Sequence, residues 1–290
     1  DAWRNGRTYV NDAPGYMGND WDHSVPGPEL WAEVNRVLVP GGYVLAFSSA
    51  RTLDLTGLAM RLGGIAVRDT LHWTYATARQ ASPDLSEVVL RLSRDEQTAR
   101  RVAGKRATLR PAHEPILVAR SPLPDDRTLL DNVLEFGTGA VNHQQRVRTN
   151  VIATHDAECA PLSCTPRCPI DPSAHGNETT HLYRDAQVAY GSLNIRKPKK
   201  SERPVASDGT RHDTVKPVEL MRYLIRVFSD RGHVVLDPFL GSGTTAEAAL
   251  IEGRNFLGCD LNHEYRDLWE QRMKRLDSVI TETGGQQRSA

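Results

Sequence analysis

An apolar run near the carboxyl end of the chain breaks into a turn that contains two glycines. The run ends at Asp237, and the turn continues through Pro238, Phe239, Gly241, Ser242, Gly243 and Thr244. Glycine lets the backbone approach a ligand closely, and the amides that begin the next helix offer hydrogen-bond donors and the positive end of a dipole. The pattern therefore predicts a nucleotide-type binding site.

Three kinds of ligand compete for this turn. A phosphate-binding loop of the ATPase kind requires a lysine after its last glycine, and Thr244 stands there instead. Gly241, Gly243 and Ala246 fit the dinucleotide pattern G-x-G-x-x-A, with Asp260 in a position to hold a ribose hydroxyl. Asp237 favours a third ligand, because a carboxylate at the strand end can face the sulfonium or ammonium of S-adenosylmethionine. We favour S-adenosylmethionine, and a nicotinamide-dependent oxidoreductase stays as the alternative.

The wider sequence resembles the DNA amino-methyltransferases of the beta order, of bacterial or phage type. The resemblance rests on residues 237–245, 212–217 and 255–260, and further similar stretches are 21–22, 36–42, 110–115 and 137–142. In this order the catalytic half comes first, a target-recognition region follows, and the S-adenosylmethionine half lies near the carboxyl end. The resemblance implies methylation of the exocyclic amine of adenine or cytosine in double-stranded DNA, typically within a restriction-modification system.

The resemblance also implies roles for particular residues. It places Thr214 and Lys216 beside the methionine carboxylate of the cofactor. Asp260 would accept both ribose hydroxyls, and the backbone from Phe239 to Gly243 would close around the methionine part. The alternative is structural: Asp237 would cap the turn and Asp260 the next helix.

The catalytic motif of the family, Asp/Asn/Ser-Pro-Pro-aromatic, has no intact copy in the chain. The nearest approach is Asp12-Ala13-Pro14-Gly15-Tyr16, so Asp12, Pro14 and Tyr16 are the candidate catalytic residues. Alanine replaces the first proline, and a glycine precedes the ring. Either this site is degenerate, or the motif lies upstream of Asp1 and these residues form an ordinary turn. We expect the second, and a DNA-binding relic without catalysis is the alternative.

Hydrophobic spacing predicts the elements that position these residues. Helices are expected at 28–38, 53–62, 217–228, 244–252 and after Asn262, and strands at 43–47, 65–73, 234–236 and 256–259. This alternation predicts an α/β fold with a Rossmann-like, mostly parallel sheet. We expect a catalytic half at 1–74, an irregular target-recognition insert at 75–207, a cofactor-binding half at 208–280 and a disordered tail at 281–290.

Soft metal ligands cluster inside the expected insert. His155, Cys159, Cys164 and Cys168 form H-x3-C-x4-C-x3-C, which suits a structural zinc ion. His175 or His181 could replace His155. Free thiols, or a disulfide in an oxidising compartment, are the alternatives.

Charge is balanced over the chain but segregated along it. Lys and Arg number 36, as do Asp and Glu, so the net charge is zero. Two basic runs could contact a phosphate backbone, or else form a solvated helix face and a linker; they comprise Arg91, Arg94, Arg100, Arg101, Lys105, Arg106 and Arg110, and then Arg196, Lys197, Lys199, Lys200 and Arg203. No apolar run reaches the roughly 20 residues of a membrane helix. We expect a cytoplasmic enzyme without membrane contact, with a homodimer as a candidate assembly.

Overall fold

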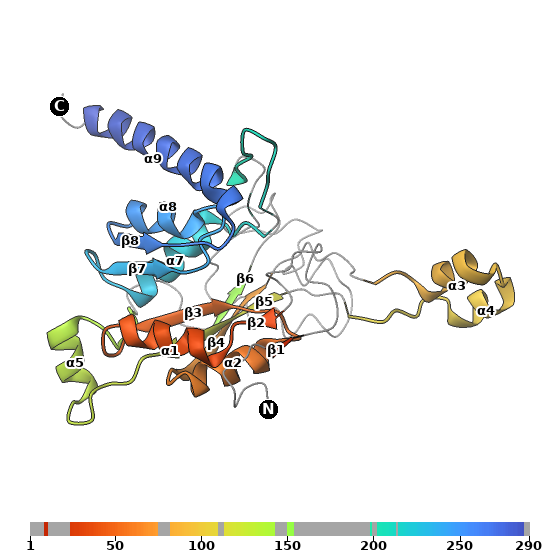
Figure 1. The fold of residues 1–290 in the computed structure, drawn as a ribbon, viewed down its shortest axis with the longest axis horizontal. Coiled ribbons are helices and arrows are strands. Elements are labelled where there is room, and N and C mark those ends of the chain that lie inside the picture. The colour runs from red at the N-terminus through yellow and green to blue at the C-terminus, as the bar shows by residue number, and fades with distance from the viewer. Residues whose placement is uncertain are drawn as a thin grey trace, which may run out of the picture.

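The computed structural model describes residues 9–10, 24–74, 82–109, 113–142, 150–153, 198, 202–212 and 214–286. The chain begins with β1 (Tyr9–Val10), β2 (Ser24–Val25), α1 (Pro28–Val37), β3 (Tyr43–Phe47), α2 (Leu53–Leu62) and β4 (Ala66–Thr74). It continues with α3 (Leu85–Ser93), α4 (Glu96–Val102), β5 (His113–Arg120), α5 (Leu129–Phe136) and β6 (Val151–Ala153). It ends with α7 (Val218–Phe228), β7 (Val234–Asp237), α8 (Thr244–Ile251), β8 (Asn255–Gly258), the 3-10 helix η5 (His263–Tyr265) and α9 (Arg266–Gln286) (Figure 1).

The larger sheet has the strand order β3-β5-β4-β6. β5 runs antiparallel to β3, with Tyr43 opposite Arg120, and antiparallel to β4, with Thr74 opposite His113. β4 and β6 are parallel. Two of its three strand pairings are therefore antiparallel, because β5 is reversed between β3 and β4, which share one direction with β6. The α/β fold class agrees with the expectation.

Helices cover both faces of this sheet because β5 is apolar on both sides. Leu117 and Ala119 pack into a cluster with Trp31 of α1 and Met60 of α2. The alternate residues of β5 face the other way, and Ile116 and Val118 join a cluster that includes Leu220, Tyr223 and Leu224 of α7. A continuous apolar run is typical of a strand that is buried on both faces. The result is a layered α/β arrangement (Figure 1).

The smaller sheet pairs β7 and β8 in parallel, with Asp237 opposite Gly258, while β1 and β2 form a separate antiparallel pair. Its cluster combines Ile225 of α7 with Ala248 and Ala249 of α8, and Val235 and Phe256 pack against them. Helix α7 therefore contacts both sheets, one side of it facing β5 and another facing β7 and β8. This shared helix joins the smaller sheet to the larger one.

Two expectations need correction. The segment 75–207 was expected to be irregular, yet β5 within it lies between β3 and β4 in the larger sheet. A disordered tail was expected from residue 281, yet α9 continues to Gln286. Glycine only weakens a helix by about 1 kcal/mol, so Gly284 and Gly285 do not stop one that has already formed. The division into domains stays a prediction.

Among the described residues, no helix combines the length and the apolar character that crossing a membrane requires.

Candidate cofactor site

The turn between β7 and α8 adopts a backbone that favours glycine at two positions. Gly241 has a φ of 50° and Gly243 a φ of 78°, both in the left-handed region. Space excludes side chains as well. A Cβ atom on Gly241 would lie 2.5 Å from Nε2 of His212, and one on Gly243 would lie 2.7 Å from Cβ of Trp269. Conformation and packing thus both require glycine here.

Asp237 lies at the end of β7, where the turn begins. Its Oδ1 accepts a hydrogen bond from the Phe239 amide at 2.9 Å. Burial raises the pKa of Asp237; hydrogen bonds from the Thr245 side chain and the Phe239 amide oppose this shift, and the neighbouring Asp260 carboxylate adds to it. A buried carboxylate next to a second carboxylate disfavours its own charge, and a cationic ligand would relieve that penalty.

Asp260 follows β8 and holds the turn from the neighbouring strand. Its Oδ2 accepts a hydrogen bond from the Gly241 amide at 2.6 Å, and its Oδ1 accepts one from the Asn262 amide at 2.8 Å. The parallel pairing of β7 and β8 brings Asp237 and Asp260 to the same edge. The residue is exposed. Each carboxylate oxygen has two lone pairs, so Asp260 keeps acceptor capacity for a ligand's hydroxyl groups.

Helix α8 begins at this turn without a side-chain cap. Its N-cap residue is Gly243, which has no side chain to accept a hydrogen bond from the first amides. Ser242 and Thr244 are buried, with exposed fractions of 4% and 6%, whereas Phe239 of the same turn stays 53% exposed. An uncapped helix start offers amide donors and a positive dipole end, and Phe239 adds apolar surface. Donors, acceptors and apolar surface fit a nucleoside ligand that carries a cation.

A buried ion pair supports the turn from beneath. Arg272 of α9 pairs with Glu247 of α8, and its Nε donates to the Ser242 carbonyl at 2.8 Å. Its Nη2 donates to the Glu202 carbonyl at 2.8 Å. Arg272 is only 2% exposed. The sequence prediction missed this residue, although its spacing carries the signal: Arg272 lies four positions from both Leu268 and Leu276, which are buried residues of α9.

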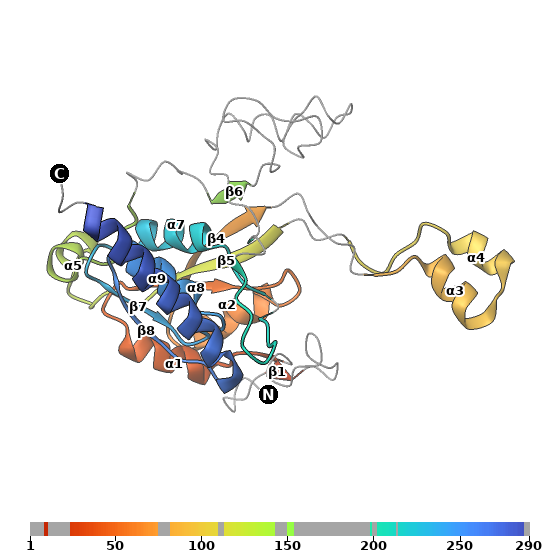
Figure 2. The ribbon, with the colours of Figure 1, turned by 90° about the horizontal axis from the view of Figure 1, so that it is seen from above.

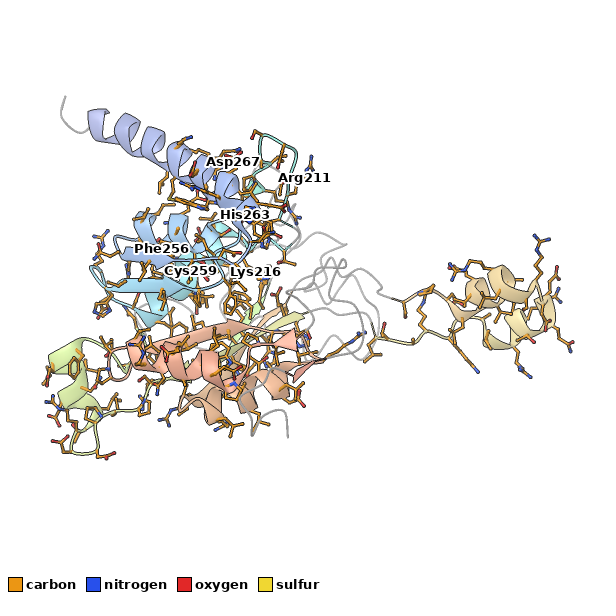
Figure 3. The ribbon with its side chains drawn as sticks, viewed as in Figure 1. Arg211, Lys216, Phe256, Cys259, His263 and Asp267 are labelled. Atoms are coloured by element: carbon orange, nitrogen blue, oxygen red, sulfur yellow. The ribbon has the colours of Figure 1, made fainter. Side chains whose placement is uncertain are left out.

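Lys216 lies between the smaller sheet and the larger sheet (Figure 3). Its Nζ is 2.7 Å from Oε1 of Glu114 at the start of β5 and 5.0 Å from the ring centre of Phe47 at the end of β3. The resemblance placed Lys216 beside a cofactor carboxylate, whereas the structure pairs it with Glu114. This ion pair links the segment before α7 to the edge of the larger sheet where β3 ends.

Thr214 is exposed, and its amide donates to Nδ1 of His212 at 3.2 Å. The His212 ring packs on Gly241 and lies 4.7 Å from the ring of Tyr265. His212 thus connects the segment 212–216 to the glycine turn. It belongs to the stretch that carried the family resemblance, but the sequence alone gave no reason to choose it.

The other candidates lie outside the described residues. These are the catalytic candidates Asp12, Pro14 and Tyr16 and the zinc candidates His155, Cys159, Cys164 and Cys168. The described part of the chain holds no group of His, Cys, Asp and Glu side chains arranged to bind a metal ion.

Comparison with known proteins identifies the family. The sequence model of the N6/N4 methyltransferase family, described as DNA methylase, matches residues 28–271. This chain belongs to the DNA methylase family. The match spans the larger sheet, the sheet of β7 and β8, the glycine turn and α7, so the site lies within the matched region.

Individual relatives agree with this membership. The methylase is 29% identical over 236 residues to the Type II methyltransferase M.HindIII of Haemophilus influenzae, a match that covers 81% of this chain and 64% of the relative. It is 54% identical over 54 residues to the Type II methyltransferase M1.MboII of Moraxella bovis, which covers 19% of this chain and 21% of the relative. The chain thus spans less than two thirds of these relatives.

Solved structures are similar only at a low level. The crystal structure of the M1.HpyAVI-SAM complex is 19% identical with a TM-score of 0.47, covering 84% of this chain and 80% of that one. TTHA0409 of Thermus thermophilus, complexed with S-adenosyl-L-methionine, is 20% identical with a TM-score of 0.44, covering 86% and 75%. At these TM-scores neither structure bears on the function of the methylase.

Proposed function

We propose that the chain binds S-adenosylmethionine and transfers its methyl group to the exocyclic amine of adenine or cytosine in double-stranded DNA. One observation carries the proposal: Asp237, Asp260 and the uncapped start of α8 converge at one turn, in a chain that belongs to the DNA methylase family. M.HindIII and M1.MboII are named as Type II methyltransferases, which supports a role in a restriction-modification system.

Different residues of the turn would bind different parts of the cofactor. Asp237 faces its cationic part, and the buried carboxylate loses its desolvation penalty when a cation comes near. Asp260 accepts the ribose hydroxyls with the lone pairs that Gly241 and Asn262 leave free. The first amides of α8 and the backbone of Gly241 and Gly243 close around the methionine part. When bound, S-adenosylmethionine supplies an electrophilic methyl group on its sulfonium.

Because the electrophile is already activated, this chain contributes mainly geometry to the reaction. The target amine must be held in line with the methyl group while water is kept away, and a base inside a duplex must first leave the stack. Asp12, Pro14 and Tyr16 are proposed for this task. Lys216 and Glu114 would keep the edge of the larger sheet in place beside the cofactor turn.

The test uses S-adenosylmethionine with a tritiated methyl group and unmethylated duplex DNA. We expect label in the DNA and, after digestion to nucleosides, N6-methyladenine or N4-methylcytosine. The Asp237→Asn variant should lose transfer, whereas Asp230→Asn, which changes an exposed aspartate of the same half, should keep it. Binding of S-adenosylmethionine without any label in the DNA would overturn the catalytic part and leave a binding domain.

Three finer features belong to the same proposal. The insert would bind one zinc ion through His155, Cys159, Cys164 and Cys168; elemental analysis of the purified protein should give one zinc per chain, and none after all three cysteines are changed to serine. The enzyme would work in the cytoplasm, where its DNA substrate lies. Sedimentation would show whether it acts as a homodimer.

A further inference from the structure

Two short helices between β4 and β5 form an arm that stands apart from the body of the protein. α3 and α4 lie away from both sheets in two perpendicular views (Figures 1 and 2). No residue of α3 is buried, and Ala99 is the one buried residue of α4. A helix pair that buries so little adds little to the hydrophobic core. Its position is that of an element that contacts something else.

The arm is held in shape by its own capping residues. Asp84 caps α3 by accepting a hydrogen bond from the Ser86 amide at 3.0 Å, and it also accepts one from the Gly104 amide at 3.0 Å. Asp95 caps α4 through the Thr98 amide at 3.0 Å. Asp84 therefore joins the two ends of the arm through hydrogen bonds within the arm itself.

Several cations on the surface of the arm form no ion pair with the residues that the structure describes. Residues 82–109 contain six Lys and Arg against four Asp and Glu, and two of these four carboxylates, Asp84 and Asp95, are occupied as caps. Four of the cations are exposed and form no ion pair with any carboxylate in the part of the chain that the structure describes; these are Arg91, Arg94, Arg101 and Lys105. This excess of positive charge on the arm favours the binding of a polyanion.

The root of the arm lies at the edge that carries the cofactor turn. β4 and β5 pair up to Thr74 and His113, and the next residue, Glu114, forms the ion pair with Lys216. The segment that contains Lys216 reaches back to His212, which packs on Gly241. If the reacting base of a duplex is bound at the cofactor turn, the neighbouring part of the duplex would therefore extend toward the arm.

We propose that the α3–α4 arm, residues 82–109, binds the phosphate backbone of the duplex beside the methylated base. Guanidinium groups match phosphate geometry, and such contacts position a protein on DNA without reading its sequence. A duplex presents one phosphate charge per about 1.7 Å of its axis, so a phosphate is within reach of each cation that faces the duplex. This inference rests on the proposed function, because it presupposes that duplex DNA is the substrate.

The test removes the four charges in one variant, Arg91→Gln, Arg94→Asn, Arg101→Gln and Lys105→Gln. Asparagine is chosen for Arg94 because this residue has a φ of 54°, which asparagine tolerates. The matched control removes four exposed cations that lie outside the arm and form no ion pair with the described residues: Arg61→Gln, Arg68→Gln, Arg231→Gln and Lys274→Gln. A third variant changes Arg91, Arg94 and Arg101 to lysine, which keeps the charge.

Duplex binding is measured by fluorescence anisotropy over a range of salt concentrations. The slope of log K against log [salt] should become shallower by about 3 to 4, since each lost phosphate contact accounts for about 0.9. Kd near 0.1 M salt should rise at least about tenfold, equally for any duplex sequence. The control and the lysine variant should keep the wild-type slope. Circular dichroism checks that every variant stays folded.

An arm variant that binds DNA with wild-type affinity and slope overturns the inference, and the arm would then serve another partner. A loss restricted to one recognition sequence, with the slope unchanged, overturns it too, because this would indicate base readout. Failure of the proposed function looks different: the wild-type protein itself would then bind no duplex.

Discussion

Removing the guanidinium of Arg272 tests whether the buried ion pair supports the cofactor turn. The change Arg272→Met keeps the aliphatic stem and leaves the Glu247 carboxylate, 7% exposed, without its buried partner. Only Arg275, at 3.0 Å and on a side chain that is 48% exposed, stays nearby. The Ser242 and Glu202 carbonyls also lose their donor.

The expected loss of stability follows from this geometry. Breaking a buried ion pair by removing one partner costs about 3–5 kcal/mol. In a domain of 150–250 residues, 1 kcal/mol corresponds to about 2–4 °C, so Tm should fall by about 6–20 °C. Urea denaturation and calorimetry measure both quantities. The double variant Glu247→Leu with Arg272→Met removes both charges and should be clearly more stable than Arg272→Met alone.

The position of Arg272 also predicts an effect on ligand binding. Because its Nε holds the Ser242 carbonyl, Arg272→Met should raise Kd for S-adenosylmethionine even at temperatures where the variant is fully folded. The reasoning is refuted if the free energy of unfolding of Arg272→Met lies within about 0.5 kcal/mol of the wild-type value, the usual effect of a surface substitution, or if the double variant is the less stable of the two.

Three further predictions concern single residues. Burial raises the pKa of Asp237 in the folded protein, so the free energy of unfolding should fall as pH rises from the ordinary aspartate pKa through the folded-state pKa. Asp237→Asn should remove this fall in a series of urea melts at different pH. Burial, together with the neighbouring His113, lowers the pKa of His72 in the folded protein. On acidification the unfolded chain therefore binds more protons than the folded protein, which lowers the free energy of unfolding. His72→Gln should reduce this loss of stability between about pH 7 and 5. Gly243→Ala should cost more than Gly232→Ala in thermal melts, because both residues have a positive φ, 78° and 84°, but only the Cβ at Gly243 meets a neighbouring atom, at 2.7 Å; equal losses would show that the contact with Trp269 is unimportant.

Hydrophobic spacing predicted most of the elements, because their patterns are local. The strand 43–47 and the helix 53–62 have the predicted bounds. Strand β5 was not predicted, because its apolar run follows His113, Glu114 and Pro115, and proline is unusual in a central strand. Its apolar residues 116–119 nevertheless match a strand buried on both faces. The sheet order is not local and depends on packing that no short window of sequence contains.

In the candidate site too, local sequence patterns could be predicted and tertiary contacts could not. The glycine turn was evident because Asp237, Gly241 and Gly243 lie within seven residues of each other. The ion pair of Lys216 with Glu114 joins residues about 100 positions apart, and that of Arg272 with Glu247 joins two helices. Contacts of this kind follow from the tertiary fold, so their residues could be noted in the sequence but their partners could not be assigned.

The most direct test of the central claim is equilibrium binding of S-adenosylmethionine by isothermal titration calorimetry, with nicotinamide adenine dinucleotide as the competing ligand. We expect saturable one-to-one binding of S-adenosylmethionine to the wild type, a large rise in Kd for Asp237→Asn, and no heat from the dinucleotide. Binding of the dinucleotide alone, or equal binding of S-adenosylmethionine by the wild type and Asp237→Asn, would contradict the assignment of the turn between β7 and α8 as its site.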